Sequence, residues 1–146
     1  MSGGATMIGL DELTARFNAL GNPEEAVGTA LVAVGDVVEA RAKTNVQKQG
    51  LILEGRLRSA IQRRKLAWNE VIVGVFDVIY AAIHEFGGVI KAKNAPYLWF
   101  KTKSGDWVRT KSVTIPARPY LRPAIYENPN ELAEIFAAVM RRLMLK

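Results

Sequence analysis

The chain contains no cysteine and a single histidine, His84, among its 146 residues. Without cysteine there are no disulfides and no thiolate chemistry, which fits synthesis in a reducing cytosol. One histidine without cysteine does not make an ordinary transition-metal site. His84 is followed by Glu85, but adjacent residues on a helix diverge by about 100° and do not face the same substrate. Because no serine has an evident base partner either, we predict no metal, no cofactor and no enzymatic activity.

Long apolar runs are also absent. No stretch approaches the ~18–20 apolar residues that span a membrane, so no membrane partner is expected. Residues 1–8 lack the basic and apolar regions of a secretory signal and are expected to form a flexible tip. Hydrophobic residues make up 49% of the chain, which is enough for a sizeable core. We predict one domain over 1–146.

The net charge of +6 is unevenly distributed. Residues 41–65 contain eight bases and one acid, and residues 91–122 contain the same numbers. The rest of the chain holds four bases and twelve acids. Such asymmetry favours contact with polyanions, with acidic protein faces or between identical subunits, although a solvated basic face is the alternative.

The first third of the chain has helical patterning. A short helix is expected over 11–20. The sequence Asn-Pro-Glu-Glu at 22–25 then predicts the start of a long helix that ends near Gln49, with Gly50 as its stop. Two glycines inside this helix, Gly28 and Gly35, predict the close approach of another element.

Residues 51–66 predict a second helix or a broken extension of the first. Its polar face is basic and includes Arg56, Arg63, Arg64 and Lys65. Such a helix can bind nucleic acid, an anionic surface or a partner protein. No aromatic residue is interleaved and no glycine-rich phosphate loop is present, which argues against specific nucleic-acid recognition.

The second half of the chain alternates between strand and helix signals. Strands are expected at 68–76, 89–91, 97–103 and 107–115, with a turn at 104–106 that makes 97–115 a hairpin. Helices are expected at 78–86 and 131–145. The pattern predicts an α+β fold: a small, mostly antiparallel sheet with a β-hairpin, packed by a long N-terminal helix and a C-terminal helix.

The predicted hairpin is rich in aromatic residues. Tyr97 and Trp99 share one of its faces, whereas Leu98 and Phe100 share the other. Only one face of an edge hairpin can enter the core of its own subunit. We therefore expect the second face to be buried against a neighbour, because lysines and arginines would otherwise border an exposed apolar patch.

The segment 112–125 combines a strand with a stiff corner. Its first half alternates in polarity, and Pro116, Pro119 and Pro123 then restrict the chain. Arg118 and Arg122 are expected to project from this corner, which has the character of a docking element.

Three pieces of the sequence carry a family resemblance. Residues 115–125 read Ile-Pro-Ala-Arg-Pro-Tyr-Leu-Arg-Pro-Ala-Ile. Upstream lie Gly-Arg-Leu-Arg-Ser-Ala-Ile at 55–61 and Tyr-Ala-Ala-Ile-His-Glu-Phe-Gly-Gly at 80–88. In this order the pieces resemble the tail-completion and virion-morphogenesis proteins of tailed phages, also called neck, head–tail joining or tail-component proteins.

The resemblance implies a structural virion protein, made in the host cytoplasm and located at the head–tail junction. It implies a homo-oligomeric ring, a hexamer, that ends the tail tube and joins it to the head while DNA passes through the lumen. The implied partners are the tail tube protein and neck or connector proteins, with non-specific contact to genomic DNA. Whether the match is to the terminator or to another neck protein stays open. A basic nucleic-acid-binding module is the alternative function.

Two sets of residues follow as expectations. The subunit or partner interface is expected to contain Arg118, Tyr120, Leu121, Arg122, Glu85, Phe86, Tyr97, Trp99 and Trp107. The candidates for DNA or lumen contact are Lys101, Lys103, Arg109, Lys111, Arg56, Arg63, Arg64 and Lys65. An ion pair between Glu85 and Arg118, within one subunit or across an interface, is a further hypothesis.

Overall fold

The computed structural model describes residues 10–51 and 54–145. The expected flexible tip at 1–8 lies outside the described residues. The elements follow in the order α1 (Leu10–Ala19), α2 (Pro23–Lys48), α3 (Glu54–Ala60), β1 (Ile61–Ala67), β2 (Glu70–Val75), α4 (Ala81–Phe86), β3 (Gly88–Lys91), β4 (Leu98–Lys101), β5 (Trp107–Thr110), β6 (Ser112–Ile115), α5 (Leu121–Tyr126) and α6 (Pro129–Met144).

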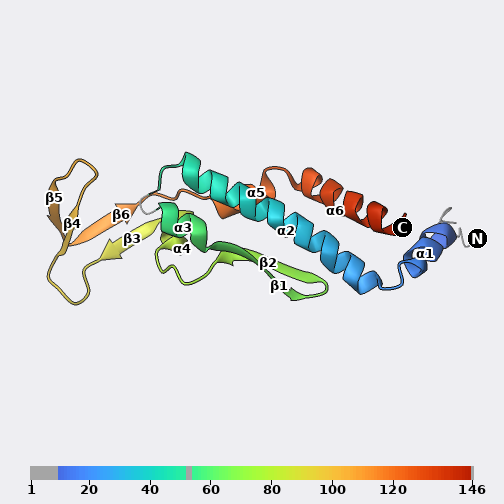
Figure 1. The fold of residues 1–146 in the computed structure, drawn as a ribbon. Helices are drawn as coiled ribbons and strands as arrows, with labels where there is room; N and C mark the ends of the chain where they lie inside the picture. Colours follow the sequence, from blue (N-terminus) through green and yellow to red (C-terminus); the bar gives the residue numbers. More distant parts are fainter. Residues whose placement is uncertain (1–9, 52–53, 146) are drawn as a thin grey trace, which may run out of the picture.

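The molecule is elongated around α2 (Figure 1). Helix α6 and the β1–β2 hairpin lie along α2, and the strands β3 to β6 extend beyond its C-terminal end as a ribbon. Helix α1 and the C-terminal end of α6 lie at the opposite end. The predicted α+β class, with a long N-terminal helix and a C-terminal helix, is confirmed. The strands form three two-stranded antiparallel ladders. The prediction of a single domain stays a prediction.

Helix α2 begins and ends where its sequence predicts. The Asn22 side chain accepts a hydrogen bond from the backbone N–H of Glu25 at 3.1 Å, and Pro23 occupies the first turn. Gly50 follows the helix with a φ of +55°, in the left-handed region that glycine adopts without a Cβ clash. Both end signals are therefore local properties of the sequence.

The glycines of α2 lie against the β1–β2 hairpin, as predicted. A Cβ on Gly28 would meet Lys65 Nζ at 2.7 Å, and a Cβ on Gly35 would meet Val71 Cγ1 at 2.8 Å. The backbone N–H of Arg63 donates to Glu39 Oε2 at 2.7 Å, which ties β1 to α2. The hairpin therefore uses the space that the two missing side chains leave on the helix.

The predicted helix over 51–66 is wrong from Ile61 onward. The short helix α3 ends at Ala60, and Ile61 pairs with Val75 in the β1–β2 ladder. The spacing of Leu57 and Ile61 is compatible with one helix face, but both side chains reach the same core from two different elements. Residues from Ile61 onward form a strand because they pair with β2, and the local periodicity of the sequence contains no information about that pairing. The expected strand 68–76 shortens to β2 because Trp68 and Asn69 form the turn.

The expected return strand 107–115 is divided. Strand β5 pairs with β4, as the hairpin prediction requires, but β6 pairs with β3 instead. The Thr110 hydroxyl donates to the Ser112 carbonyl at 2.9 Å, so the backbone bends around Lys111. The four strands therefore form one continuous ribbon made of two ladders.

Two clusters make up the core. The larger one joins the C-terminal half of α2 to α3, β1, α4 and α5, and the smaller one joins the N-terminal half of α2 to α6. The larger cluster contains Val38, Ala42, Val46, Leu51, Leu57, Ile61, Ala81, Tyr120 and Ala124. Over the described residues, no helix has the length and apolar character that crossing a membrane requires.

We expect Ile61→Ala to lower the free energy of unfolding by about 2–5 kcal/mol, because it leaves a cavity in the larger core cluster. Leu66→Ala on the same strand is the matched control, since Leu66 is 58% exposed. It should change the free energy of unfolding by less than about 0.5 kcal/mol. Urea denaturation followed by circular dichroism measures both. Equal effects would contradict the inward orientation of Ile61.

Candidate functional site

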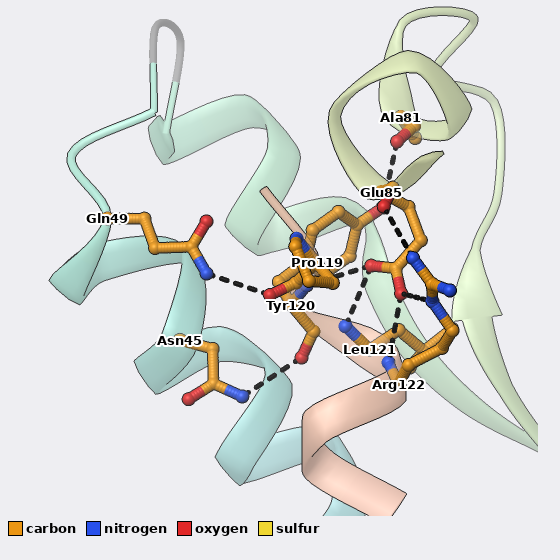
Figure 2. Close-up of polar contacts among 8 residues, drawn as sticks. All are labelled: Asn45, Gln49, Ala81, Glu85, Pro119, Tyr120, Leu121 and Arg122. Carbon is orange, nitrogen blue, oxygen red and sulfur yellow. Dashed lines mark hydrogen bonds and ion pairs between the residues drawn. The ribbon is translucent and has the colours of Figure 1, made fainter. Parts of the chain in front are cut away.

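The Glu85 carboxylate is the centre of a polar cluster between α4 and α5 (Figure 2). Oε2 accepts the backbone N–H groups of Tyr120 at 2.8 Å and Leu121 at 3.0 Å. Oε1 accepts the backbone N–H of Arg122 at 3.0 Å and its Nε at 3.1 Å. Glu85 thus satisfies the first N–H groups of α5, which have no partner inside the helix.

The charge of Glu85 is maintained despite burial, with only 5% of the residue exposed. Burial raises the pKa of a carboxyl, but the three backbone N–H groups and the Arg122 guanidinium outweigh it and hold the pKa of Glu85 below its ordinary value. The result is an ionised carboxylate fixed in the interior of the chain.

The predicted pair between Glu85 and Arg118 does not form within the chain. Arg122 occupies that place and also donates from Nη2 to the Glu85 carbonyl oxygen at 3.1 Å. Arg118 contributes its backbone N–H, which donates to the His84 carbonyl at 2.7 Å, and its side chain is exposed. Both arginines lie in the segment that follows β6, and the start of α5 turns Arg122 toward the carboxylate.

Tyr120 is buried, with 2% of the residue exposed. Its hydroxyl donates to the Ala81 carbonyl at 3.3 Å, and burial followed by the charge of Glu85 raises its pKa to about 12. Two carboxamides, one on α2 and one at its C-cap, hold the same segment: Asn45 donates to the Tyr120 carbonyl at 3.0 Å and Gln49 to the Pro119 carbonyl at 2.7 Å. Two expected interface residues, Glu85 and Tyr120, therefore lie inside the subunit.

The remaining expected interface residues of this region differ in exposure. Leu121 is half-buried at the edge of the larger core cluster. Phe86 is largely exposed, with the Arg122 guanidinium carbon 5.0 Å from its ring centre. The helices and the β1–β2 hairpin together form the body of the molecule. Phe86, Arg118 and part of Arg122 thus remain available on the surface where the ribbon leaves this body.

Gly87 allows the ribbon to cross the segment after β6. Its φ of 71° and ψ of 177° lie in a region that is essentially restricted to glycine. A Cβ at this position would lie 2.7 Å from the backbone nitrogen of Ala117 and 3.0 Å from the Ile115 carbonyl oxygen. The close approach of two backbones therefore requires glycine here.

The far end of the ribbon presents aromatic and cationic side chains on one face. The register pairs Trp99 with Arg109 and Lys101 with Trp107, so these four residues share a face. Trp99 is 68% exposed and Trp107 is 67% exposed, and their rings meet edge to face with centres 6.3 Å apart. The Arg109 guanidinium carbon lies 3.9 Å from the ring centre of Tyr97. Aromatic and arginine side chains of this kind are typical of binding hot spots.

The basic candidates for DNA contact do not share one surface. Lys101, Lys103, Arg109 and Lys111 lie along the β4–β5 half of the ribbon. Arg56, Arg63, Arg64 and Lys65 are divided between α3 and β1. Arg63 pairs with Asp36 at 2.6 Å, and the Arg64 guanidinium carbon lies 3.6 Å from the ring centre of Phe76. The expected basic helix face therefore does not exist.

Sequence reasoning missed helix α5 and its cap. The signal was Pro123, which falls in the first turn of α5, where a missing N–H is not needed. The sequence does not indicate that the capping carboxylate comes from another element. Within the described residues, no group of three His, Asp or Glu side chains is placed to hold a metal ion.

The family described as phage virion morphogenesis matches residues 8–143 of the chain, which include the Glu85 cluster and the whole ribbon. An uncharacterized protein of Methanocaldococcus jannaschii is 29% identical over 110 residues. This match covers 74% of the chain but 65% of that protein, so the chain spans about two thirds of this relative. No solved structure matches the chain.

We expect Glu85→Gln to lower the free energy of unfolding at pH 7 by about 2–3 kcal/mol, because an amide replaces a charged acceptor of four hydrogen bonds. The folded-state pKa of Glu85 is depressed, so its contribution is present above the ordinary value of 4.5 and is lost as the pH falls through the lower folded-state pKa. The wild type and the variant should therefore converge in acid. Urea denaturation from pH 3 to 7 measures this. The exposed Glu134→Gln is the control, and a constant difference at all pH values would contradict the ionised cap.

Gly87→Ala tests the backbone crossing. It should cost at least about 2 kcal/mol more than Gly21→Ala, because Gly87 adds a glycine-only combination of φ and ψ and a close backbone contact to the positive φ that both positions share. Gly21 has a φ of +65° and nothing within 4 Å of its Cβ position. Thermal or urea unfolding compares the two variants. Equal losses would show that the dihedral angle alone, and not the crossing, requires glycine.

Proposed function

Because the chain belongs to the phage virion morphogenesis family, we propose that it is a structural subunit of the head–tail connection in the virion. In this proposal it forms a ring, a hexamer, that ends the tail tube as a tail-completion or neck protein. The ring joins the tube to the head, and the genome passes through its lumen. The role is structural and not catalytic.

One observation carries the proposal: the ribbon exposes an apolar surface that the described residues of the chain do not cover. Its exposed large side chains are Val89, Ile90, Trp99, Phe100 and Trp107, and Phe86 at the end of α4 is exposed beside it. A two-stranded ribbon has one layer and no core of its own, so these side chains remain in water unless another chain covers them. A subunit that functions in an assembly has such a surface.

The shape of the molecule also suits a ring. The ribbon lies at one end of the long axis and the α1–α6 region at the other (Figure 1). These two ends differ in structure, so a contact between unlike surfaces of successive copies is available. Such head-to-tail contacts close into a ring when the rotation between copies closes.

The alternative of a stand-alone nucleic-acid-binding module loses one of its two supports. It rested on the basic pI of about 9.8 and on a basic helix over 56–65. The structure divides those residues between a helix and a strand. Within the proposal, the lysines and arginines of the ribbon contact either the acidic face of a tube protein or DNA in the lumen. DNA contacts of this kind are non-specific and depend on salt.

The double variant Trp99→Ser with Trp107→Ser tests the role of the ribbon. We expect it to fold normally, because both side chains are exposed, but not to form the discrete high-mass species that the proposal predicts for the wild type. Light scattering at low and high salt, with and without DNA, measures the mass. Complementation of a phage lacking the protein measures the yield of tailed particles.

Trp68→Ser is the matched control, since Trp68 is also exposed but lies in the β1–β2 turn. It should assemble and complement as the wild type does. Normal complementation by the double variant would contradict the role of the ribbon. A wild-type monomer that binds DNA tightly at low salt and releases it at high salt would favour the nucleic-acid module.

A further inference from the structure

A pocket of about 240 Å³ lies where the ribbon meets the body, and two cationic side chains line it. Lys103 comes from the loop between β4 and β5, and Arg118 comes from the segment between β6 and α5. The other lining residues are His84, Ile115 and Pro116. The described lining therefore contains two positive charges and no carboxylate.

Both cations keep most of their side-chain donors free of partners among the described residues. Lys103 Nζ donates to the Gly50 carbonyl at 3.2 Å, which occupies one of its three N–H groups. The backbone N–H of Arg118 donates to the His84 carbonyl, and none of the five donors of its guanidinium has a partner within 10–51 and 54–145. Elsewhere in the described chain, five arginines and lysines pair with carboxylates: Arg16, Arg41, Lys43, Arg63 and Arg122.

His84 contributes its ring to the lining of the pocket. Its Nδ1 is buried and has no hydrogen-bond partner, which is unusual for a buried polar atom. Burial, and then the charge of Arg118, lower its pKa, so the ring is neutral at pH 7. The groups that face this ring are Tyr80, whose ring centre lies 5.8 Å away, and the cations Arg118 and Lys103 of the shared pocket.

The apolar part of the lining distinguishes between possible anions. Ile115 and Pro116 offer a surface for methylene groups beside the two cations. A glutamate or aspartate side chain has an apolar stem and a charged end, which matches such a lining. A phosphate in duplex DNA has no apolar stem and lies on a convex backbone that a pocket of this size does not enclose.

We propose that the pocket lined by Lys103, Arg118 and His84 binds the acidic side chain of a partner protein in the assembled virion. The presence of such a partner rests on the proposed function, whereas the carboxylate chemistry rests on the pocket itself. A bound carboxylate would bridge the loop of the ribbon to the body. It would thereby fix the direction in which the ribbon points when the partner docks.

His84 is the only histidine of the sequence, so its Hε1 proton gives one resolved NMR signal at the site. The probe is a capped tetraglutamate peptide, added to the full chain at low ionic strength and pH 7. We expect a saturable movement of the His84 signal. A capped tetraglutamine peptide of the same length should leave the signal in place.

Two variants and a control assign the effect to the pocket. Lys103→Gln and Arg118→Gln should each weaken peptide binding about tenfold or more, because each removes a charge-assisted contact. Lys91→Gln makes the same charge change at an exposed ribbon position and should bind as the wild type does. Circular dichroism spectra are the check that all three variants are folded.

Three outcomes would overturn the inference. The first is a signal that does not move with the peptide. The second is an equal loss of binding in Lys91→Gln, which would indicate general charge attraction. The third is a response to a duplex oligonucleotide or inorganic phosphate that exceeds the response to the peptide. Particle mass and phage complementation test the assembly role separately, so either proposal can fail while the other stands.

Discussion

The Glu85 carboxylate joins segments that lie 35 residues apart, and the rest of the molecule is arranged around that connection. It lies in the last turn of α4, caps α5 and pairs with Arg122 in the same place. An unsatisfied buried carboxylate would be costly, and so would unsatisfied N–H groups at the start of α5. The carboxylate and the N–H groups form hydrogen bonds with each other, so neither is left buried without a partner. The connection also brings the two ends of the ribbon together at the body, because α4 precedes β3 and α5 follows β6.

A second constraint is the close approach of backbones at glycine. On α2, Gly28 and Gly35 let the β1–β2 hairpin lie directly on the helix. At Gly87, the chain entering the ribbon passes the chain leaving it with no space for a side chain. The glycines and the Glu85 cap thus hold the helices and the β1–β2 hairpin together as the body, from which the ribbon extends.

The difference between the body and the ribbon is the physical basis for the proposed assembly role. Both core clusters lie within the body, whereas the ribbon leaves two tryptophans largely exposed. The pocket with Lys103 and Arg118 lies at the junction of the two parts. A partner at this junction would contact the fixed and the projecting parts of the subunit together.

The sequence by itself determined the elements that depend on local signals. Helix α2 begins at its Asn-Pro cap and ends before Gly50, because capping and φ preferences act over a few residues. The α+β class and the β4–β5 hairpin followed from periodicity and turn residues in the same way. The motifs at 55–61, 80–88 and 115–125 were sufficient to indicate the family.

Only the tertiary structure decided the pairing of distant groups. Ile61 becomes a strand residue because β2 pairs with it, although its spacing from Leu57 also fits a helix. Glu85 binds Arg122 instead of Arg118, and Tyr120 enters the core, because helix α5 begins between the two arginines. A helix of six residues has little stability alone and forms here on its cap and its packing. Its partners lie far away in the sequence, so no local pattern could report them.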